Sequence, residues 1–556
     1  MAEPQWGAAA WLQVAAVVVI IAAVHVPLGN YIARVFTTQR DLRAERAIYR
    51  LVGVAPRDEQ DWKKYLGSLL AFSAVSVLGL YALLLGQQYL PRPWGHPGIT
   101  PALAFNTAVS FVTNTSWQSY DPEQTLGHLG LAVGLGVQAF ASAAVGICAA
   151  MALIRGLSRH RTDEVGNFWV DLIRAIVRIL LPIAAVLSLV FLAAGVVESL
   201  AGPQGFGTIT GGSQTILRGP VASWEPIKLM SGDGGGAFNV SSAHPFENPN
   251  PITNVLEIVA MLLIPSALVR AYGVMIRDKR QSWALFAVVA VLFGLGLGLM
   301  SAAEAHSSQT VVQAAGAAME GTETRFGVPG SALFGQAATA SADGAVNSSY
   351  DSFAGLGGGV LMANMMLGEV APGGTGSGLY ALVMMALLAA FLGGLMVGKT
   401  PEYLRKRVGS RETKLISLYI LTGPAVILTG LGIAMALPGE RAQMGNTGPH
   451  GMSEVMYAFT SSAAGNGSSF AGLGANTTWY NTALAIAMLL GRYVPMIFVL
   501  ALAGSFAAQQ RGVVTVGTLK THSPMFIGLI IGTTLVMVGL EYFPALALGP
   551  LADGIG

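Results

Sequence analysis

The sequence predicts an all-α polytopic membrane protein, and three observations indicate this fold class. Charged residues make up only 11% of the 556-residue chain and hydrophobic residues 53%, whereas ordinary soluble domains have roughly 25% charged residues. Ten apolar stretches are long enough to cross a bilayer. Four short loops rich in Gly, Ser, Thr and Asn interrupt the apolar sequence at intervals of about 110 to 120 residues. We therefore expect ten transmembrane helices with four parallel membrane-pore-membrane repeats around one axis.

The ten predicted spans follow from the length that a helix needs to cross a membrane. A hydrocarbon core about 30 Å thick requires roughly 20 apolar residues. The first stretch has no basic region before it and no small-residue cleavage site after it, so we expect a retained helix rather than a signal peptide. The predicted spans are 9–34, 65–88, 128–155, 170–198, 253–275, 282–303, 361–398, 415–437, 482–507 and 524–548.

Basic residues lie in every second connection between these spans. The basic segments follow the first, third, fifth, seventh and ninth spans, at 34–64, 155–161, 277–280, 399–414 and 511–520. Lys and Arg are enriched in cytoplasmic loops of membrane proteins. Both termini and all four polar loops are therefore predicted to lie on the external side.

Pairing the two spans around each polar loop gives four units within one transmembrane domain, 1–556. The units cover 65–155, 170–275, 282–398 and 415–507, with 9–34 and 524–548 as extra first and last spans. All four units cross the membrane in the same sense, which predicts parallel repeats and not the inverted repeats common in secondary transporters.

The four loops have a composition that suits cation binding. They lie at 113–118, 231–239, 341–346 and 464–468, and each follows a segment that could form a half-membrane helix (LAFNTAVSF, WEPIKLM, SALFGQAA and SEVMYAF). A cation without its water needs oxygens in its place, and rings of backbone carbonyls supply them in potassium channels. Gly permits the unusual dihedrals that such a ring requires. Similar clusters are also ordinary turns, but the equal spacing on one face favours an ion pore or an ion-binding vestibule.

Several long strings resemble a known family. TNTSWQSY, GDGGGAFNVSSAHPFENP, GEVAPGGTGSGLYALV, GKTPEYLRKRV and GNGSSFAGLGANT are similar to the potassium-binding, channel-like subunit of the Kdp-type potassium-transporting ATPases, over nearly the whole chain. The resemblance implies a fold of the potassium-channel-like superfamily with one selectivity filter that binds external potassium. It also implies a tunnel that leads the ion to a P-type ATPase subunit, small accessory subunits, and a location in the bacterial plasma (inner) membrane.

The resemblance assigns residues of all four loops to the potassium-binding filter. They are Thr113, Asn114, Thr115, Ser116 and Gln118; Ser231, Gly232, Asp233, Gly234 and Asn239; Ser341, Asp343 and Gly344; and Gly465, Asn466 and Gly467. Ser116, Asp233 and Gly465 replace the Asn that is usual in the family, and Asp343 replaces a small uncharged residue. We expect these carboxylates to concentrate cations or to stiffen the loops by accepting backbone N–H bonds, with an effect on fine selectivity.

Two charged residues and a run of Gly lie inside predicted spans. Glu369 and Arg492 are in an environment where ionised groups are costly and usually paired or functional. The resemblance associates similar positions with the vestibule and the tunnel, and the alternative is a structural ion pair that joins two repeats. The Gly-rich run at 373–378 predicts a broken seventh helix that would gate the space below the filter.

The chain is predicted to have no catalytic activity of its own. The string at 393–400 matches the phosphate-loop pattern, but that chemistry needs a strand, a Gly-rich loop and a helix N-terminus, whereas this string ends an apolar helix. The sequence has no DKTGT phosphorylation string and no large domain for ATP. We expect no direct nucleotide binding, no nucleic-acid partner at a net charge of +2, and ATP hydrolysis in a partner chain.

Two alternatives stay open at the level of sequence. A self-sufficient potassium channel or a Trk/Ktr-like potassium-translocating subunit would share the four-repeat plan. A membrane-embedded enzyme would use Asp233, His244 and Glu247 of the second external connection. His244 and His450 lack the spacing of metal ligands, so we expect them to be structural or solvated, with potassium as the only bound metal ion.

Overall fold

The computed structural model describes residues 6–91, 93–305, 319–398, 400–512 and 519–555. Within this part of the chain, ten helical segments are long and apolar enough to span a membrane, and each overlaps one predicted span. The spans are formed by α1 (Ala8–Thr37), α3 (Trp62–Leu85), α6 (Gly136–Ser158), α7 (Phe168–Arg174) with α8 (Leu181–Ala193), α10 (Pro251–Met275), α11 (Lys279–Ala305), α15 (Ser377–Met396), α16 (Ser410–Ala436), α19 (Thr478–Ala508) and α20 (Pro524–Leu546). The prediction of ten transmembrane helices is confirmed.

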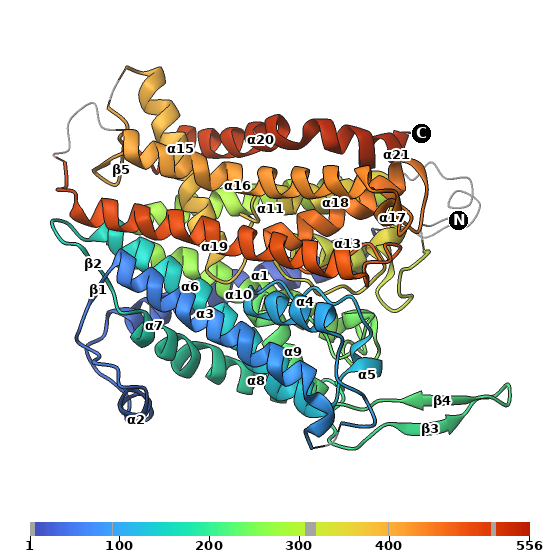
Figure 1. Ribbon diagram of the computed structural model, residues 1–556. Helices are drawn as coiled ribbons and strands as arrows, with labels where there is room; N and C mark the ends of the chain where they lie inside the picture. Colours follow the sequence, from blue (N-terminus) through green and yellow to red (C-terminus); the bar gives the residue numbers. More distant parts are fainter. Residues whose placement is uncertain (1–5, 92, 306–318, 399, 513–518, 556) are drawn as a thin grey trace.

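The spanning helices run roughly along one direction, and both chain termini lie at the same end of the bundle (Figure 1). We call this end the termini face and the opposite end the basic face, because the basic connections lie there. Three two-stranded antiparallel ribbons and several short helices cover the two ends. They are β1 (Gln60–Asp61) with β2 (Glu164–Gly166), β3 (Gln204–Gly207) with β4 (Ser213–Ile216), β5 (Glu402–Tyr403) with β6 (Lys406–Arg407), and helices α2 (Arg43–Val52), α5 (Pro122–Thr125), α17 (Pro438–Arg441) and α21 (Ala552–Ile555).

Four half-length helices lead into the polar loops, as the sequence predicts. They are α4 (Pro101–Val112), α9 (Val221–Ser231), α13 (Gly327–Ala340) and α18 (Gly448–Ala464). Helices α4 and α18 have Pro in the first turn, where its missing N–H costs no hydrogen bond. Helices α9 and α18 are followed by Gly232 and Gly465 in the left-handed conformation, which is the common way for a helix to end.

The seventh predicted span is broken. Residues 361–398 form two helices, α14 (Gly355–Met366) and α15, joined by the non-helical segment 367–376. Gly376 in this segment has φ +99°, and a Cβ at this position would overlap the backbone of Gly146 on α6. The predicted break is confirmed, although it begins at Leu367 rather than within 373–378, and Ser377 is already helical.

The second helix of each predicted unit is more buried than the first. In the most apolar windows of the second helices, 83%, 83%, 72% and 44% of the residues are buried, against 28%, 28%, 39% and 28% in the first helices. The outer helices therefore present apolar side chains that suit lipid, whereas α6, α10, α15 and α19 lie inside. This recurring order agrees with four related units, while the boundaries of these units stay a prediction.

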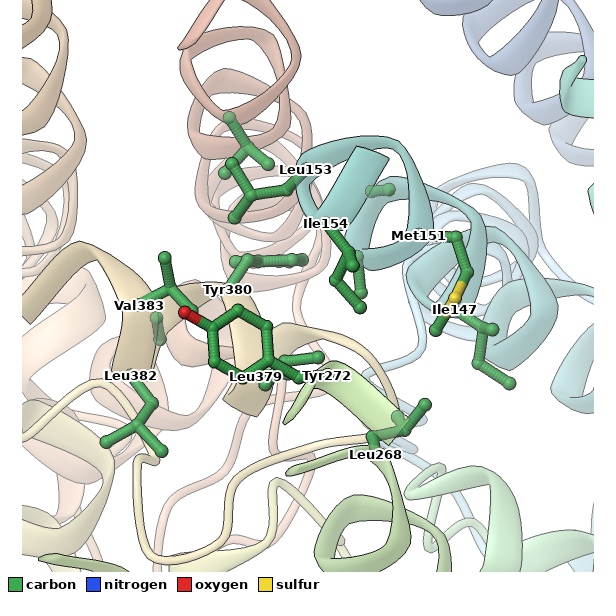
Figure 2. Packing of buried hydrophobic residues seen from close by; sticks show 14 of the residues in the cluster. Ile147, Met151, Leu153, Ile154, Leu268, Tyr272, Leu379, Tyr380, Leu382 and Val383 are labelled. Carbon is green, nitrogen blue, oxygen red and sulfur yellow. The ribbon is translucent and has the colours of Figure 1, made fainter. Parts of the chain in front are cut away.

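The inner helices pack apolar side chains against one another on the basic-face side of the polar loops. Figure 2 shows residues of α6, α10 and α15 in one core, among them Ile154, Tyr272 and Leu382. Along α6, Ser142 contacts the first polar loop, and residues 147–154 lie further towards the basic face. The space below the loops is therefore filled by close apolar packing of these three helices.

Candidate ion-binding site

The four polar loops share one hydrogen-bond pattern. In each loop a backbone N–H donates to the carbonyl of the residue five positions earlier, in the last turn of the half-length helix. The pairs are Thr115 to Ser110 (2.9 Å), Asp233 to Lys228 (3.2 Å), Asp343 to Ala338 (3.0 Å) and Asn466 to Ser461 (2.9 Å). This register makes Thr115, Asp233, Asp343 and Asn466 equivalent in position, which the spacing of the loops in the sequence does not reveal.

The residue before each of these positions has a positive φ. The values are +60° at Asn114, +70° at Gly232, +57° at Ala342 and +85° at Gly465. The left-handed conformation costs residues other than Gly about 1–2 kcal/mol, so Asn114 and Ala342 adopt it only because surrounding contacts compensate. Such dihedrals change the direction of successive peptide planes, as a ring of inward-facing carbonyls requires.

The four loops form a closed ring, which we call the four-loop ring and define as residues 113–116, 231–234, 341–344 and 464–467. Each loop touches the next, and the fourth touches the first, through one side-chain hydrogen bond and three close backbone approaches at Gly residues. The contacts are Asn114 Nδ2 donating to Gly232 O (3.0 Å), Gly234 against Gly344, Gly344 against Asn466 O, and Gly467 against Thr115 O. All four loops therefore surround one point.

Two carboxylates lie within this ring, at equivalent positions of the second and third loops. Asp233 is 1% exposed and Asp343 is fully buried. Ser116 Oγ donates to Asp233 Oδ1, so the structure pairs two of the residues that depart from the family pattern. Asp343 Oδ1 accepts from the backbone N–H of Ala345 (2.9 Å). Within the described residues, the Oδ2 atoms of both aspartates have no hydrogen-bond partner, so each aspartate has one oxygen that holds the loop and one that is unpaired.

A cavity of about 450 Å³ lies on the termini-face side of the ring, and we call it the outer cavity. It is lined by a ring residue from each loop, namely Ser116, Gly234, Gly344 and Gly467. Gln118 and Asn239, which follow the ring residues of the first and second loops in the sequence, also line this cavity. Gln118 Nε2 donates to the Tyr120 hydroxyl (3.2 Å), and Asn239 is exposed.

A smaller cavity of about 110 Å³, the inner cavity, lies beside the fourth loop and is lined by Glu369 and Arg492. It extends from Ala464 of the ring to Glu541 on α20. The Arg492 guanidinium donates to the backbone carbonyl of Ser142 (3.2 Å). Among the described residues, Glu369 and Arg492 do not form an ion pair with each other, so the geometry gives no support to a structural ion pair between them.

The segment 367–376 lies directly against the inner side of the ring. Thr375 Oγ1 donates to Met230 O (3.0 Å), and the N–H of Gly373 donates to Ala340 O (2.9 Å). Both carbonyls belong to the last turns of half-length helices, where no partner exists within the helix. The break in the seventh span thus supplies donors to two half-length helices, at the junction between the ring and the inner cavity.

The residues of the enzyme alternative have separate partners. His244 stacks on Phe238 with ring centroids 3.8 Å apart, and Glu247 accepts a hydrogen bond from Lys228, while Asp233 is paired with Ser116. The phosphate-loop string begins inside α15, so a helix and not a strand precedes it, and its Lys399 lies outside the described residues. The partners of the three residues do not fit an acid–base site, and the helix before the string does not fit a phosphate-binding loop.

His450 joins two segments that are about 100 residues away in the sequence. Its Nδ1 lies 2.9 Å from Asp553 Oδ2 and its Nε2 3.2 Å from Asp351 Oδ1. The hydrogen bond to Asp351, together with that to Asp553, raises the pKa of His450 from 6.5 to about 9. Asp351, His450 and Glu454 are close enough to hold a metal ion, but their ligand atoms already have protein partners. This cluster supports the expected structural role of His450.

The sequence matches a known family over nearly its whole length. The model of the family described as "Potassium-transporting ATPase A subunit" matches residues 15–555. The chain belongs to this family. The potassium-transporting ATPase potassium-binding subunit of Clavibacter michiganensis subsp. michiganensis is 53% identical over 549 residues, and the match covers 98% of each chain. The corresponding subunit of Mycobacterium avium is 54% identical over 544 residues, with 97% of this chain and 98% of that chain covered.

A solved structure shows the same fold at much lower identity. The potassium transporter TrkH from Vibrio parahaemolyticus aligns with a TM-score of 0.53 and 15% sequence identity, over 80% of this chain and 85% of that chain. At this identity the likeness concerns the fold alone. It agrees with the predicted fold class, an all-α polytopic membrane protein.

Proposed function

We propose that this chain is the potassium-binding subunit of an ATP-driven potassium uptake complex. In this proposal it binds external K⁺ in the four-loop ring and passes the ion sideways, through the membrane, to a P-type ATPase subunit. Its membership of the potassium-transporting ATPase A subunit family supports the proposal. The observation that carries it is the closed ring of four loops with one shared register and a left-handed residue in each.

The ring has the chemistry that a dehydrated K⁺ needs. Backbone carbonyls of four loops replace the hydration oxygens, and the unpaired oxygens of Asp233 and Asp343 are two further acceptors for a cation. Helices α4, α9, α13 and α18 all end at the ring, so the negative ends of four helix dipoles lie near the same point. A cation is favoured there by each of these three contributions.

The direction of transport follows from the two faces. The basic connections lie at the basic face, which the positive-inside rule assigns to the cytoplasm. The outer cavity lies on the other side of the ring, so K⁺ would enter from the outside past Gln118 and Asn239. In this proposal both termini lie outside, and the protein belongs to the bacterial plasma membrane.

The proposed lateral route rests on a contrast between the apolar core on the basic-face side of the ring and the inner cavity beside it. Apolar side chains of α6, α10 and α15 pack into one core (Figure 2), which lies on the basic-face side of the ring, and a desolvated ion is very costly there. The inner cavity instead extends from the ring to α20, past Glu369 and Arg492. We infer that this cavity begins the intramembrane tunnel, and that the segment 367–376 gates its entrance.

Energy for uptake would come from a partner chain. The curated relatives are described as subunits of an ATPase, and the sequence contains no DKTGT phosphorylation string. ATP hydrolysis is therefore assigned to the P-type ATPase subunit, which assembles with this chain and with small accessory subunits. A self-sufficient channel or Trk/Ktr-like subunit is the competing proposal, since TrkH shares the fold.

Two measurements on the purified full-length chain test the proposal. In a thermal unfolding assay, K⁺ should raise the melting temperature more than Na⁺ at the same ionic strength, because a ligand at 100 times its Kd stabilises the folded state by about 2.7 kcal/mol. In liposomes without ATP or partner subunits, the chain should conduct no K⁺. Absence of K⁺-specific stabilisation would refute ion binding in the ring, and K⁺ flux through the chain alone would favour the channel.

A further inference from the structure

A buried lysine distinguishes the second loop from the other three. The carbonyl that accepts the repeated hydrogen bond belongs to a small residue in three loops, namely Ser110, Ala338 and Ser461, and to Lys228 in the second. The Lys228 side chain is fully buried. Burying an ammonium group is costly unless it is paired and hydrogen-bonded, so its surroundings need a physical explanation.

The ammonium group of Lys228 has oxygen partners on three residues. Nζ lies 2.7 Å from Glu247 Oε2, 2.8 Å from Ser242 Oγ and 3.2 Å from Glu225 Oε2. All four side chains have 0% exposure, and we call them the Lys228 cluster. Hydrogen bonds between charged groups are shorter and roughly twice as strong as neutral ones, so this cluster is a rigid support.

The Lys228 cluster holds the second loop at both of its ends. At the start, the Lys228 carbonyl accepts the N–H groups of Asp233 (3.2 Å) and Gly234 (3.0 Å). At the end, Glu247 Oε1 accepts the N–H groups of Ala237 (3.0 Å) and Phe238 (3.2 Å). The Lys228–Glu247 ion pair therefore connects the segment that enters the ring with the segment that leaves it.

Other loops achieve a similar connection with a single hydroxyl group. Ser110 Oγ donates to Trp117 O (3.0 Å) in the first loop, and Ser461 Oγ accepts from the N–H of Gly467 (2.9 Å) in the fourth. Both serines occupy the position of Lys228. The second loop is the one in which this connection depends on an ion pair between residues 19 positions apart.

We propose that Lys228 and Glu247 are positioning residues for ion selectivity, which act through the backbone of the second loop without touching the ion. This inference rests on the proposed function, because it requires K⁺ to bind in the four-loop ring. Selectivity depends on where the ring oxygens lie and how firmly they are held. Removing the ion pair frees one of the four loops and allows the ring to adapt to a smaller cation.

The test uses the full-length chain with Lys228 and Glu247 changed together, K228M/E247Q, so that this ion pair is removed as a unit. The apparent Kd values for K⁺ and Na⁺ are measured from the dependence of the melting temperature on salt concentration. We expect the preference for K⁺ over Na⁺ to fall roughly tenfold, because the N–H groups of Ala237 and Phe238 lose their charged acceptor. S242A removes the 2.8 Å hydrogen bond from Lys228 and leaves the Lys228–Glu247 ion pair in place, so it should shift the preference in the same direction by roughly threefold.

Lys406→Met provides a matched control for the loss of a buried lysine. Lys406 on β6 is also fully buried, and its ammonium donates to the carbonyls of Arg159, Phe506 and Gln509 at the basic face, away from the ring. It should lower the melting temperature and leave the K⁺/Na⁺ preference unchanged. An unchanged preference in K228M/E247Q and S242A would overturn the inference, as would an equal shift in Lys406→Met. Absence of K⁺-specific stabilisation in the wild-type chain would instead refute the proposed function.

Discussion

Gly467→Ala should weaken K⁺ binding because it forces the fourth loop away from the first. Gly467 has φ +99°, which side-chain-bearing residues rarely adopt, and a Cβ at this position would overlap the carbonyl oxygen of Thr115. That oxygen belongs to the four-loop ring, so any relief of the overlap displaces one of the groups proposed to face the ion. The substitution therefore combines a backbone penalty with a steric one at the closing contact of the ring.

The steric part of this effect can be isolated with Gly448→Ala. Gly448 begins the helix α18 that leads into the same loop; its φ is +69°, and no atom lies within 4 Å of a Cβ built there. Both substitutions thus include a cost of about 1–2 kcal/mol for a left-handed Ala. Overpacking a close contact adds typically 1–3 kcal/mol, which applies to Gly467→Ala alone.

The expected difference in affinity follows from this second cost. When the overlap is relieved by moving the ring oxygens, the steric cost of about 1–3 kcal/mol is lost from the free energy of K⁺ binding. Binding should then be about 5- to 150-fold weaker in Gly467→Ala than in Gly448→Ala. The measurement is the K⁺ concentration that gives half-maximal thermal stabilisation of the full-length chain. Equal K⁺ affinities of the two variants would show that the contact between the fourth and first loops does not shape the ion site, and the ring argument would fail.

Three further changes test other parts of the site. The Ser116 hydroxyl donates to the Asp233 carboxylate, so the effects of S116A and D233N on K⁺ binding should not add. In a double-mutant cycle we expect a coupling energy of about 1 kcal/mol or more. Additive effects would contradict this pairing. T375V removes the donor to the end of a half-length helix and should change the transport rate of the assembled complex more than K⁺ affinity; an unchanged rate would argue against gating. The pKa of His450 is raised from 6.5 to about 9, so its stabilising effect is complete below pH 6.5 and lost as the pH rises through about 9. The melting temperature should therefore fall between pH 7 and 10 in the wild type and less in H450Q, and parallel curves would contradict the hydrogen bonds of His450 with Asp351 and Asp553.

The sequence identified the four loops and the half-length helices before them, because both depend on local composition. Gly- and Ser-rich stretches permit irregular backbone, and each is preceded by a segment of helix-compatible residues. The register within the ring was not predictable, since the left-handed conformation at Ala342 has no signal in the residue type. The resemblance assigned Gln118 and Asn239 to the filter, and the structure adds that both line the outer cavity.

The Lys228 cluster shows a second limit of sequence interpretation. Lys228 lies in the apolar segment WEPIKLM, and Glu247 was considered only as part of an alternative enzyme site. Their ion pair joins residues 19 positions apart and buries both completely. Sequence alone shows that a charged residue is present, but the identity of its partner depends on how the loop folds back over the half-length helix.

By itself, the sequence determined that the chain spans the membrane ten times, which face is basic, and to which family it belongs. The spans follow from the length of the apolar stretches, because backbone in lipid must satisfy its hydrogen bonds within each helix. The basic face follows from the positive charge of the short connections. Only the tertiary structure decided that the four loops close into one ring, with Asn114 bonded to Gly232 and Gly467 against Thr115. Those contacts join residues more than 100 positions apart, and they form only when the inner helices have brought the loops together.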